Sequence, residues 1–206
     1  REEARARGVP ALATYGCTEA CSQVATQSMA QLGTLGSGAP LPGIELRIED
    51  GEVQVRGDAL MDGYLGQLRK GSAWSDDGWF RTGDLGAFLP DGQLVVRGRR
   101  DDLIITGGEN VAPQEVEAWL ESLPGVASAC VFAVADETWG SAVAAAIIAE
   151  GPEFDPGSLR ERARDGLADY KRPKWIAMLD AFPLNRSGKV DRAAVAECCE
   201  GKLDAI

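Results

Sequence analysis

A lysine close to the C-terminal end of the chain is a candidate for catalysis. Lys189 follows Ser187 and Gly188 in the stretch FPLNRSGKVDR, residues 182–192. An ammonium on a glycine-containing loop can act as a point charge that stabilises negative charge developing on a substrate. The spacing is not that of a P-loop, because the upstream glycine spacing and the following hydroxyl residue are both wrong. The alternative is a solvated turn before the last helix.

A second candidate is the stretch TYGCTEA near the start of the chain. Gly16, directly after Tyr15, would let the backbone approach a ligand closely. Thr18 could donate to a phosphate oxygen, and Glu19 could hold a hard cation such as Mg²⁺. The alternative is structural, with Thr18 as a helix N-cap and Glu19 as an acid in the first turn.

Two further stretches carry polar groups at places where a strand is expected to end. In FRTGDLG, Asp84 follows a glycine, and its two acceptor oxygens could hold a vicinal diol such as a ribose. The alternative there is an Asx-type turn. In GRRDDLIITGGEN, the charged run Arg99–Asp102 suits a hinge between domains, and the Gly107–Gly108 pair offers a surface without side chains. A charged linker followed by a β-turn is the alternative.

The stretches DETWGSAV and LADYKRPK form a possible pair. Trp139 precedes a glycine, and Tyr170 is followed by three cations within four residues, Lys171, Arg172 and Lys174. An aromatic face with clustered cations suits a phosphorylated adenine nucleotide, through stacking and charge-assisted hydrogen bonds. A core tryptophan and a solvated basic loop are the alternative.

The elements that must position these residues change in character near residue 100. Alternating patterns predict one hairpin over residues 44–57 and another over 79–100. After Arg100 we expect a short strand with a Gly-Gly turn, then a helix from Pro113 whose apolar face carries Val116, Trp119, Leu120 and Leu123. The other expected elements are a helix end at 2–7, strands at 10–16, 127–136, 141–150 and 173–179, a helix from Leu159 to Tyr170, and a last helix at 191–199.

These patterns predict an α+β protein of two parts, residues 1–100 and 101–206. The chain has 206 residues with a net charge of −11, which argues against general nucleic-acid binding. It contains no histidine, so histidine-based nucleophile activation and metal ligation are excluded. Its five cysteines form no CxxC motif, and no apolar stretch is long enough to span a bilayer. We therefore expect a cytoplasmic protein with reduced thiols.

The ordered blocks YGCTE, RTGD, GRRDD with TGGEN, and NRSGK resemble the C-terminal part of the acyl- and aryl-CoA synthetases, a family of adenylate-forming, AMP-binding enzymes. WGSAV and YKRPK lie between them, and the resemblance runs from about Ala13 to the end of the chain. It implies a ligase that converts an acid and ATP into an acyl-adenylate and pyrophosphate, and then transfers the acyl group to CoA with release of AMP.

The resemblance also implies roles for individual residues. Tyr15, with Gly16 beside it, would lie near the adenine, Thr18 would contact the phosphate, and Glu19 would help to bind Mg²⁺. Asp84 and Arg99 would hold the ribose. Asp101 would be the hinge, Gly108 would line the pantetheine tunnel, and Lys189 would be the adenylation lysine. The CoA nucleotide would be contacted by Trp139, Arg172 and Lys174.

The resemblance also bears on the extent and the substrates of the protein. The family's phosphate loop is absent, so we expect a fragment of a longer enzyme: the end of the large AMP-binding domain, then a mobile C-terminal domain. YGCTEACSQVAT, with Ser22, Gln23 and Thr26, is most similar to ligases that act on o-succinylbenzoate in menaquinone synthesis. Medium-chain fatty acids, other aryl acids and a non-catalytic adenylate-binding module stay open. The expected partners are the acid, ATP, Mg²⁺ and CoA, with a homo-oligomer possible.

Overall fold

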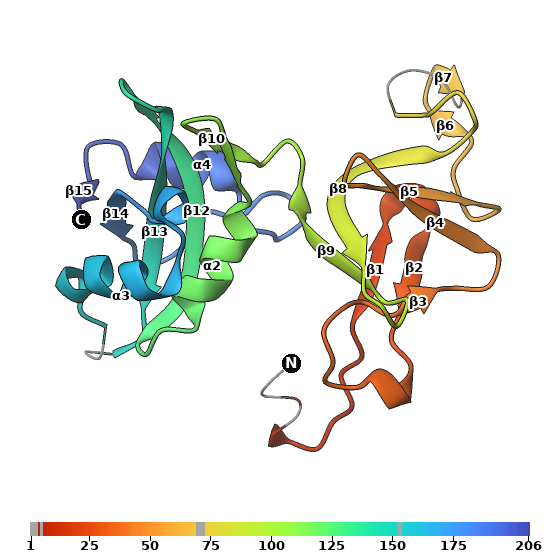
Figure 1. Cartoon of the computed structure of the whole chain (residues 1–206), viewed down its shortest axis with the longest axis horizontal. Coiled ribbons are helices and arrows are strands. Elements are labelled where there is room, and N and C mark those ends of the chain that lie inside the picture. The colour runs from red at the N-terminus through yellow and green to blue at the C-terminus, as the bar shows by residue number, and fades with distance from the viewer. Residues whose placement is uncertain (1–3, 5, 69–72, 152–153) are drawn as a thin grey trace. The chain divides into compact units, whose positions relative to one another are not determined.

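The computed structural model describes residue 4 and residues 6–68, 73–151 and 154–206. The chain divides into two compact units, Arg1–Asp101 and Asp102–Ile206, which we term the first unit and the second unit (Figure 1). The division falls within the charged run Arg99–Asp102. The expected helix end at 2–7 includes residues 2, 3 and 5, which lie outside the described residues. No helix in the described ranges is long and apolar enough to cross a membrane.

The first unit is built mainly of antiparallel strands. Its larger sheet has the order β4 (Ile44–Glu49), β5 (Glu52–Gly57), β8 (Phe80–Phe88) and β9 (Leu94–Arg99). A second sheet has the order β1 (Thr14–Cys17), β2 (Ser22–Thr26) and β3 (Ala39–Pro40). The short strands β6 (Gly63–Tyr64) and β7 (Gln67–Leu68) pair with each other. Two 3₁₀ turns, Thr18–Ala20 and Met29–Gln31, connect the smaller elements.

Both hairpins that the sequence predicts are confirmed. β4 and β5 pair from Ile44 opposite Gly57 to Glu49 opposite Glu52, and the two linking residues have positive φ, 50° at Asp50 and 77° at Gly51. Two left-handed residues give the backbone twist that suits a two-residue hairpin. Val53 and Val55 of β5 are fully buried and pack with Val24 of β2 in the core of this unit. One hydrophobic cluster therefore joins its two main sheets.

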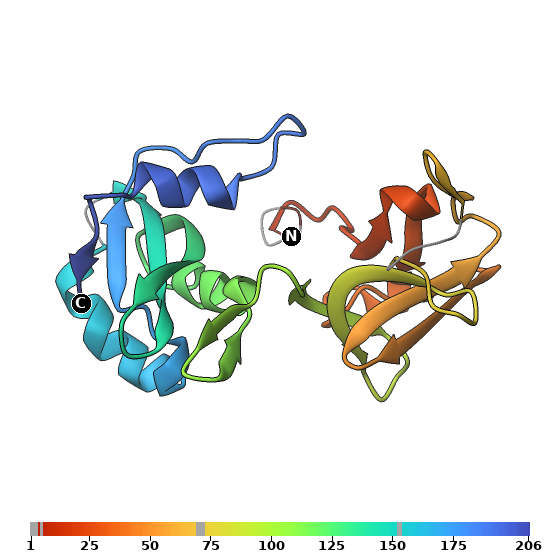
Figure 2. The ribbon, with the colours of Figure 1, turned by 90° about the horizontal axis from the view of Figure 1, so that it is seen from above.

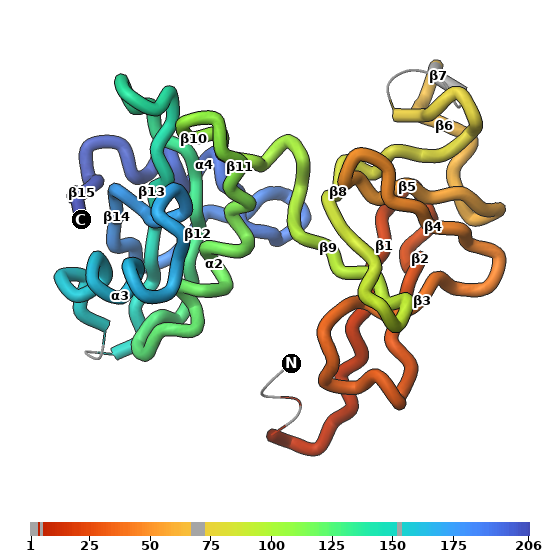
Figure 3. Tube along the Cα trace, in the orientation of Figure 1, coloured from red at the N-terminus to blue at the C-terminus, as the bar shows by residue number. Residues whose placement is uncertain are grey.

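In its described residues, the second unit combines a four-stranded sheet with three α-helices. The sheet order is β12 (Val126–Asp136), β13 (Gly140–Ala149), β14 (Trp175–Met178) and β15 (Asp204–Ala205). β13 and β14 are parallel, and the other neighbouring pairs are antiparallel. A separate hairpin joins β10 (Ile104–Thr106) to β11 (Glu109–Val111) through Gly107 and Gly108, at φ of 57° and 86° (Figure 3). The helices are α2 (Pro113–Glu121), α3 (Leu159–Gly166) and α4 (Arg192–Cys198).

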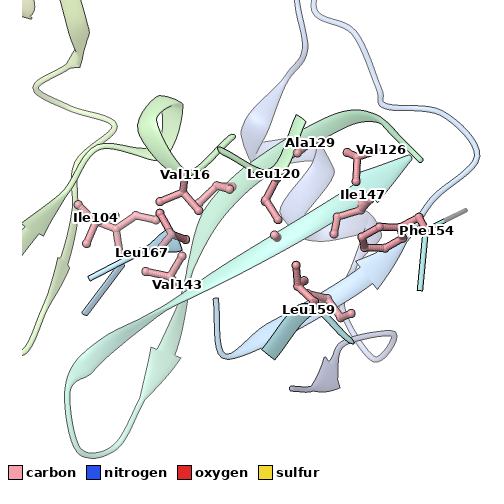
Figure 4. Packing of buried hydrophobic residues seen from close by; sticks show 14 residues of the cluster. Ile104, Val116, Leu120, Val126, Ala129, Val143, Ile147, Phe154, Leu159 and Leu167 are labelled. Atoms are coloured by element: carbon pink, nitrogen blue, oxygen red, sulfur yellow. The ribbon is translucent and has the colours of Figure 1, made fainter. Parts of the chain in front are cut away.

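Helices cover both faces of this sheet (Figure 2). On one face, Val116 and Leu120 of α2 and Leu159 of α3 pack against inward-facing residues that include Val143 and Ile147 of β13 (Figure 4). On the other face, α4 and the segment after it contribute buried residues that pack against Ala144 and Ala146 of the same strand, together with Phe132. Because β13 is buried on both sides, it is a nearly continuous apolar run rather than an alternating one.

The α+β class is confirmed, with three local differences from expectation. The first strand covers Thr14–Cys17 instead of 10–16. Tyr170 does not belong to the helix that begins at Leu159, because α3 ends at Gly166 and Tyr170 lies in a separate 3₁₀ turn, Asp169–Lys171. Gly166 passes so close to Trp119 that a Cβ there would lie 2.1 Å from the indole nitrogen. The helix therefore ends where the chain must fit around α2. The sequence also gives no indication of β15.

Candidate functional site

Tyr15, Asp84 and Arg99 come together in the first unit from three different strands. The Tyr15 hydroxyl donates to Asp84 Oδ2 at 2.6 Å, and Arg99 Nη1 contacts Asp84 Oδ1 at 3.2 Å. Arg99 faces Asp84 across the β8–β9 ladder. Burial and the neighbouring Asp84 raise the pKa of Tyr15 above its usual range, so the phenol remains a hydrogen-bond donor. Asp84 is thus held at both oxygens and keeps lone pairs for a further donor.

The surroundings of Asp84 differ from the expected strand-to-turn segment. Asp84 lies inside β8, and the irregularity is at Gly83, which has a φ of 73° within the strand. The Gly83 amide donates to Glu52 Oε1 at 2.8 Å, and Glu52 also pairs with Arg100 at 3.3 Å. Glu52 is 7% exposed. This buried carboxylate holds the distorted part of the strand in place, and nothing in the sequence identified it.

Gly16 is required for packing between strands. A Cβ at this position would lie 1.6 Å from the Ser22 carbonyl oxygen, so only glycine allows β1 and β2 to approach here. The structural alternative for Thr18 is wrong, because Cys17 occupies the N-cap position of the short 3₁₀ turn and makes no side-chain capping bond. Thr18 is exposed. Its side chain is therefore free of the capping role that the sequence offered.

Glu19 is oriented by a residue far along the chain. The Tyr64 hydroxyl donates to Glu19 Oε1 at 2.7 Å. Both residues line a cavity of about 380 Å³ whose other walls include Thr82, Gly83 and Arg99. Asp101 also reaches this cavity. The first unit thus brings Glu19, Arg99 and Asp101 to one cavity. Tyr15 and Asp84 do not line it, and Asp84 is connected to it through its contact with Arg99.

In the second unit, Trp139 and Lys174 are organised by Asp136. Asp136 Oδ1 accepts the backbone amides of Thr138 and Trp139, each at 2.9 Å, and Oδ2 lies 3.4 Å from the Lys174 ammonium. The ammonium in turn lies 5.2 Å from the centre of the Trp139 ring, a cation–π distance. The Trp139 amide is the largest cause that lowers the pKa of Asp136. One carboxylate therefore contacts both the backbone of Trp139 and the ammonium of Lys174.

The Gly-Gly turn supports the same ring. The Gly107 amide donates to the Trp139 carbonyl oxygen at 3.1 Å, and a Cβ on Gly107 would lie 2.5 Å from the ring. The ring is half exposed, at 51%. It lines a cavity of about 140 Å³ together with Gly107, Tyr170, Arg172 and Lys174. The structure thus brings together Trp139, Arg172 and Lys174, whereas Gly108 is exposed at the tip of the turn and does not line this cavity.

Arg172 has a structural task in addition to any ligand contact. Its Nε donates to the Leu167 carbonyl at 3.0 Å, and its Nη2 donates to the Arg164 carbonyl at 3.2 Å. Its Nη1 pairs with Asp169 at 2.6 Å. These are carbonyls at the end of α3, so the guanidinium caps that helix.

Lys189 lies on an exposed tight turn of the second unit. Leu184 and Val190 form an isolated β-bridge, and Asn185 Oδ1 accepts the amides of Ser187 and Lys189 at 2.9 and 3.1 Å. Gly188 has a φ of 77°, which favours glycine. Within the described part of the chain, no hydrogen bond or ion pair holds the Lys189 ammonium. The backbone of the turn is fixed, and the side chain extends from it into solvent.

Comparison with known proteins identifies the family. Residues 115–189 match the AMP-binding enzyme C-terminal domain. The chain is 42% identical over 205 residues to the 2-succinylbenzoate–CoA ligase of Bacillus licheniformis, covering 93% of this chain and 42% of that protein. It is 35% identical to the indoleacetate–CoA ligase of Aromatoleum aromaticum, covering 95% and 41%. Residues 115–189 thus belong to the family of AMP-binding enzyme C-terminal domains.

Solved structures of AMP-binding enzymes share the fold. The o-succinylbenzoate CoA synthetase (MenE) from Bacillus subtilis, in complex with the acyl-adenylate OSB-AMP, matches with a TM-score of 0.82 at 38% identity, covering 94% of this chain and 42% of that chain. The same protein in complex with ATP and magnesium ion matches at a TM-score of 0.79 and 38% identity, covering 93% and 42%. The chain therefore spans about two fifths of the length of the relatives that it matches.

The candidate site also contains residues that the sequence did not single out. Tyr64 and Glu52 gave no signal, because their partners lie far along the chain. Asp136 could have been found as an aspartate at a strand end, where it accepts amides two and three residues later. No three His, Cys, Asp or Glu side chains of the described residues gather to hold a metal. A lone Glu19 suits Mg²⁺ only if substrate phosphates supply other ligands, as is usual for this ion.

Proposed function

We propose that the chain is the C-terminal part of an ATP-dependent acid–CoA ligase. The observation that carries the proposal is the 42% identity to a 2-succinylbenzoate–CoA ligase along 93% of the chain. The reaction has two steps. A carboxylate attacks the α-phosphorus of ATP and expels pyrophosphate, and the CoA thiol then attacks the acyl carbon and expels AMP.

In the first step, the residues of the first unit hold the nucleotide. Asp84 and Arg99 bind the ribose hydroxyls, and Tyr15 and Gly16 lie beside the adenine. Support comes from the fixed Asp84 carboxylate, which retains acceptor capacity. Thr18 contacts the phosphate, and Glu19, oriented by Tyr64, contributes one ligand to Mg²⁺. When bound, that ion neutralises charge on the phosphate oxygens.

Lys189 supplies the positive charge that the first step requires. Attack of a carboxylate on a phosphate brings two anions together, and a preorganised cation stabilises the negative charge that develops. No general base is needed, because the acid is already ionised at neutral pH. The exposed Lys189 turn and the division of the chain at Asp101 support a second unit that moves about Asp101 between the two steps.

For the second step, we propose that the second unit binds CoA. Gly108 lies along the pantetheine, and Trp139, Arg172 and Lys174 contact the nucleotide. Support comes from the cavity that Trp139, Arg172 and Lys174 share and from the half-exposed ring. A flat aromatic face with cations beside it is suited to a phosphorylated adenine nucleotide.

The acid that we propose is o-succinylbenzoate, as used in menaquinone synthesis. Ser22 and Gln23 are exposed on β2 and could donate to a second carboxylate. Thr26 is more constrained, because its hydroxyl lies 2.9 Å from that of Thr14. Another aryl acid is the second candidate, since the chain is also similar to an indoleacetate–CoA ligase. We place the enzyme in the cytoplasm, where the five free cysteines stay reduced.

The test uses the full-length enzyme that contains this chain, with ATP, Mg²⁺, CoA and a panel of acids. The panel contains o-succinylbenzoate, indoleacetate, benzoate and octanoate. We expect AMP and the CoA thioester to form with o-succinylbenzoate at the highest kcat/KM. Highest activity with another acid would contradict o-succinylbenzoate as the substrate but would still support the proposed ligase reaction. Binding of ATP without release of pyrophosphate for any acid would contradict the ligase and favour a non-catalytic adenylate-binding module.

A further inference from the structure

The turn that carries Lys189 extends from the second unit as two short legs. Figure 2 shows the segment between β14 and α4 reaching beyond the end of the helix. Leu184 and Val190 bridge the two legs, and the Asp191 amide donates to the Pro183 carbonyl oxygen at 2.9 Å. These bonds hold the legs to each other but do not attach them to the sheet. The attachment of the turn to the second unit therefore depends on contacts at its base.

Arg192, the first residue of α4, is bound at the base of this turn. Its Nη1 donates to Glu117 Oε1 of α2 and to the Val131 carbonyl oxygen of β12. The same Glu117 oxygen accepts the Val131 amide at 2.8 Å. The side chains of Arg192 and Glu117 are 27% and 16% exposed, so salt and water screen this ion pair less than one on an open surface. One carboxylate thus joins a helix, a strand and the base of the lysine turn.

The connection from Arg192 back to Lys189 is short and internally bonded. Arg192 follows Lys189 by three residues. Asp191 is the N-cap of α4, where its side chain accepts the Ala194 amide at 3.2 Å, and Val190 belongs to the bridge between the legs. Because both intervening residues are held, a shift of Arg192 would be passed on to the turn rather than absorbed before it.

We propose that Glu117 is a positioning residue for Lys189 and acts through Arg192. This inference rests on the proposed function, in which the Lys189 ammonium stabilises charge during acyl-adenylate formation. The backbone of the turn sets where that ammonium can reach, and Arg192 fixes the backbone on α2 and β12. A misplacement of about 1 Å can slow a reaction roughly 10²-fold. Loss of the Glu117–Arg192 pair therefore slows the step that uses Lys189.

Glu121 provides a matched control on the same helix. It follows Glu117 by four residues in α2, and its Oε1 accepts the Ala129 amide of β12 at 3.1 Å. Its other hydrogen bond is to the Ser128 hydroxyl at 3.3 Å. Both glutamates thus tie α2 to β12, but in the described part of the chain only Glu117 also binds Arg192. Glu121→Gln should therefore change neither step of the reaction by more than about twofold.

The test measures both steps in the full-length enzyme that contains this chain. Glu117→Gln keeps an acceptor for the Val131 amide but removes the charge that holds Arg192. We expect Glu117→Gln and Arg192→Gln each to slow pyrophosphate exchange roughly tenfold, with less than about twofold change in thioester formation from a supplied acyl-adenylate. The double variant should also lose roughly tenfold, because both changes break the same pair. Hydrogen exchange of the backbone amides of residues 184–191 should be faster in each variant and unchanged in Glu121→Gln.

Several results would overturn the positioning role. Equal losses in the two steps, or an equal loss in Glu121→Gln, would indicate a general structural defect, and unchanged hydrogen exchange at residues 184–191 would show that the pair does not anchor the turn. Lys189→Ala separates this inference from the proposed function. If Lys189→Ala abolishes pyrophosphate exchange and Glu117→Gln leaves it intact, the proposed function stands and the positioning role falls. If Lys189→Ala leaves the exchange intact, the role of Lys189 falls, and the positioning role falls with it.

Discussion

The two units hold their candidate functional side chains in different ways. In the first unit, Asp84 is gripped by Tyr15 from a strand 69 residues earlier and by Arg99 across its own ladder. In the second unit, Lys189 sits on a turn whose backbone is fixed by Asn185 but whose ammonium is exposed. Groups that bind a ligand in one position gain from being held in advance, because no ordering is needed on binding. A side chain that has to enter a site for one step and leave it for the next can move more easily when no other residue binds it.

The largest expected effect comes from the exposed lysine. Lys189→Ala in the full-length enzyme should slow acyl-adenylate formation by at least roughly 10²-fold, the scale of losing one preorganised stabilising group. Pyrophosphate exchange measures this step. Thermal stability should not change, because the side chain is exposed. Thioester formation from a supplied acyl-adenylate should be nearly unaffected, and equal losses in both steps would contradict a lysine that acts only in the first.

The next largest effect should come from the buried phenol of Tyr15. Unlike the change at Lys189, it should lower the stability of the protein. Tyr15→Phe removes the donor to Asp84 Oδ2. Losing a buried hydrogen bond of this kind costs about 1–3 kcal/mol, so the free energy of unfolding should fall by that amount. Urea denaturation measures this change. An unchanged stability together with a large loss of activity would show that the first unit does not hold its site in the way described.

A smaller effect is expected for the aromatic ring of the second unit. Trp139→Ala should raise the KM for CoA roughly tenfold and leave pyrophosphate exchange unchanged, since one stacking contact is worth about 1 kcal/mol or slightly more. Asp136→Asn should raise the same KM by a few fold, because Trp139 and Lys174 lose a common anchor. If Trp139→Ala lowered stability and left the KM for CoA unchanged, the ring would be a packing residue.

The smallest effect concerns the rates at which thiols are alkylated. Burial raises the pKa of Cys17 and raises that of Cys130 to about 11, so less of each is thiolate at neutral pH. Iodoacetamide at pH 7.5 should therefore label the exposed Cys21 and Cys198 first, as mass spectrometry of digests would show. Tyr15→Phe should speed the labelling of Cys17 and not that of Cys130. Faster labelling of both would mean that the two units do not unfold independently.

Local sequence signals were sufficient where neighbouring residues decide the structure. The Asp50-Gly51 and Gly107–Gly108 turns, and the helix that starts at Pro113, follow from φ preferences and apolar periodicity. They were insufficient where distant segments decide it. The helix at Leu159 stops before Tyr170 because Gly166 must pass Trp119, and β15 forms because β14 offers an open edge.

The same distinction applies to the site. The residue types and their order along the chain determined which groups are candidates: the Asp84 carboxylate, the Lys189 ammonium, the Trp139 ring, and no histidine. Only the tertiary structure decided that Tyr15 holds Asp84, that Tyr64 orients Glu19, and that Asp136 joins Trp139 to Lys174. The reason is physical. A side chain's chemistry is a property of the residue alone, whereas its position and partners depend on the packing of segments that lie far apart in the sequence.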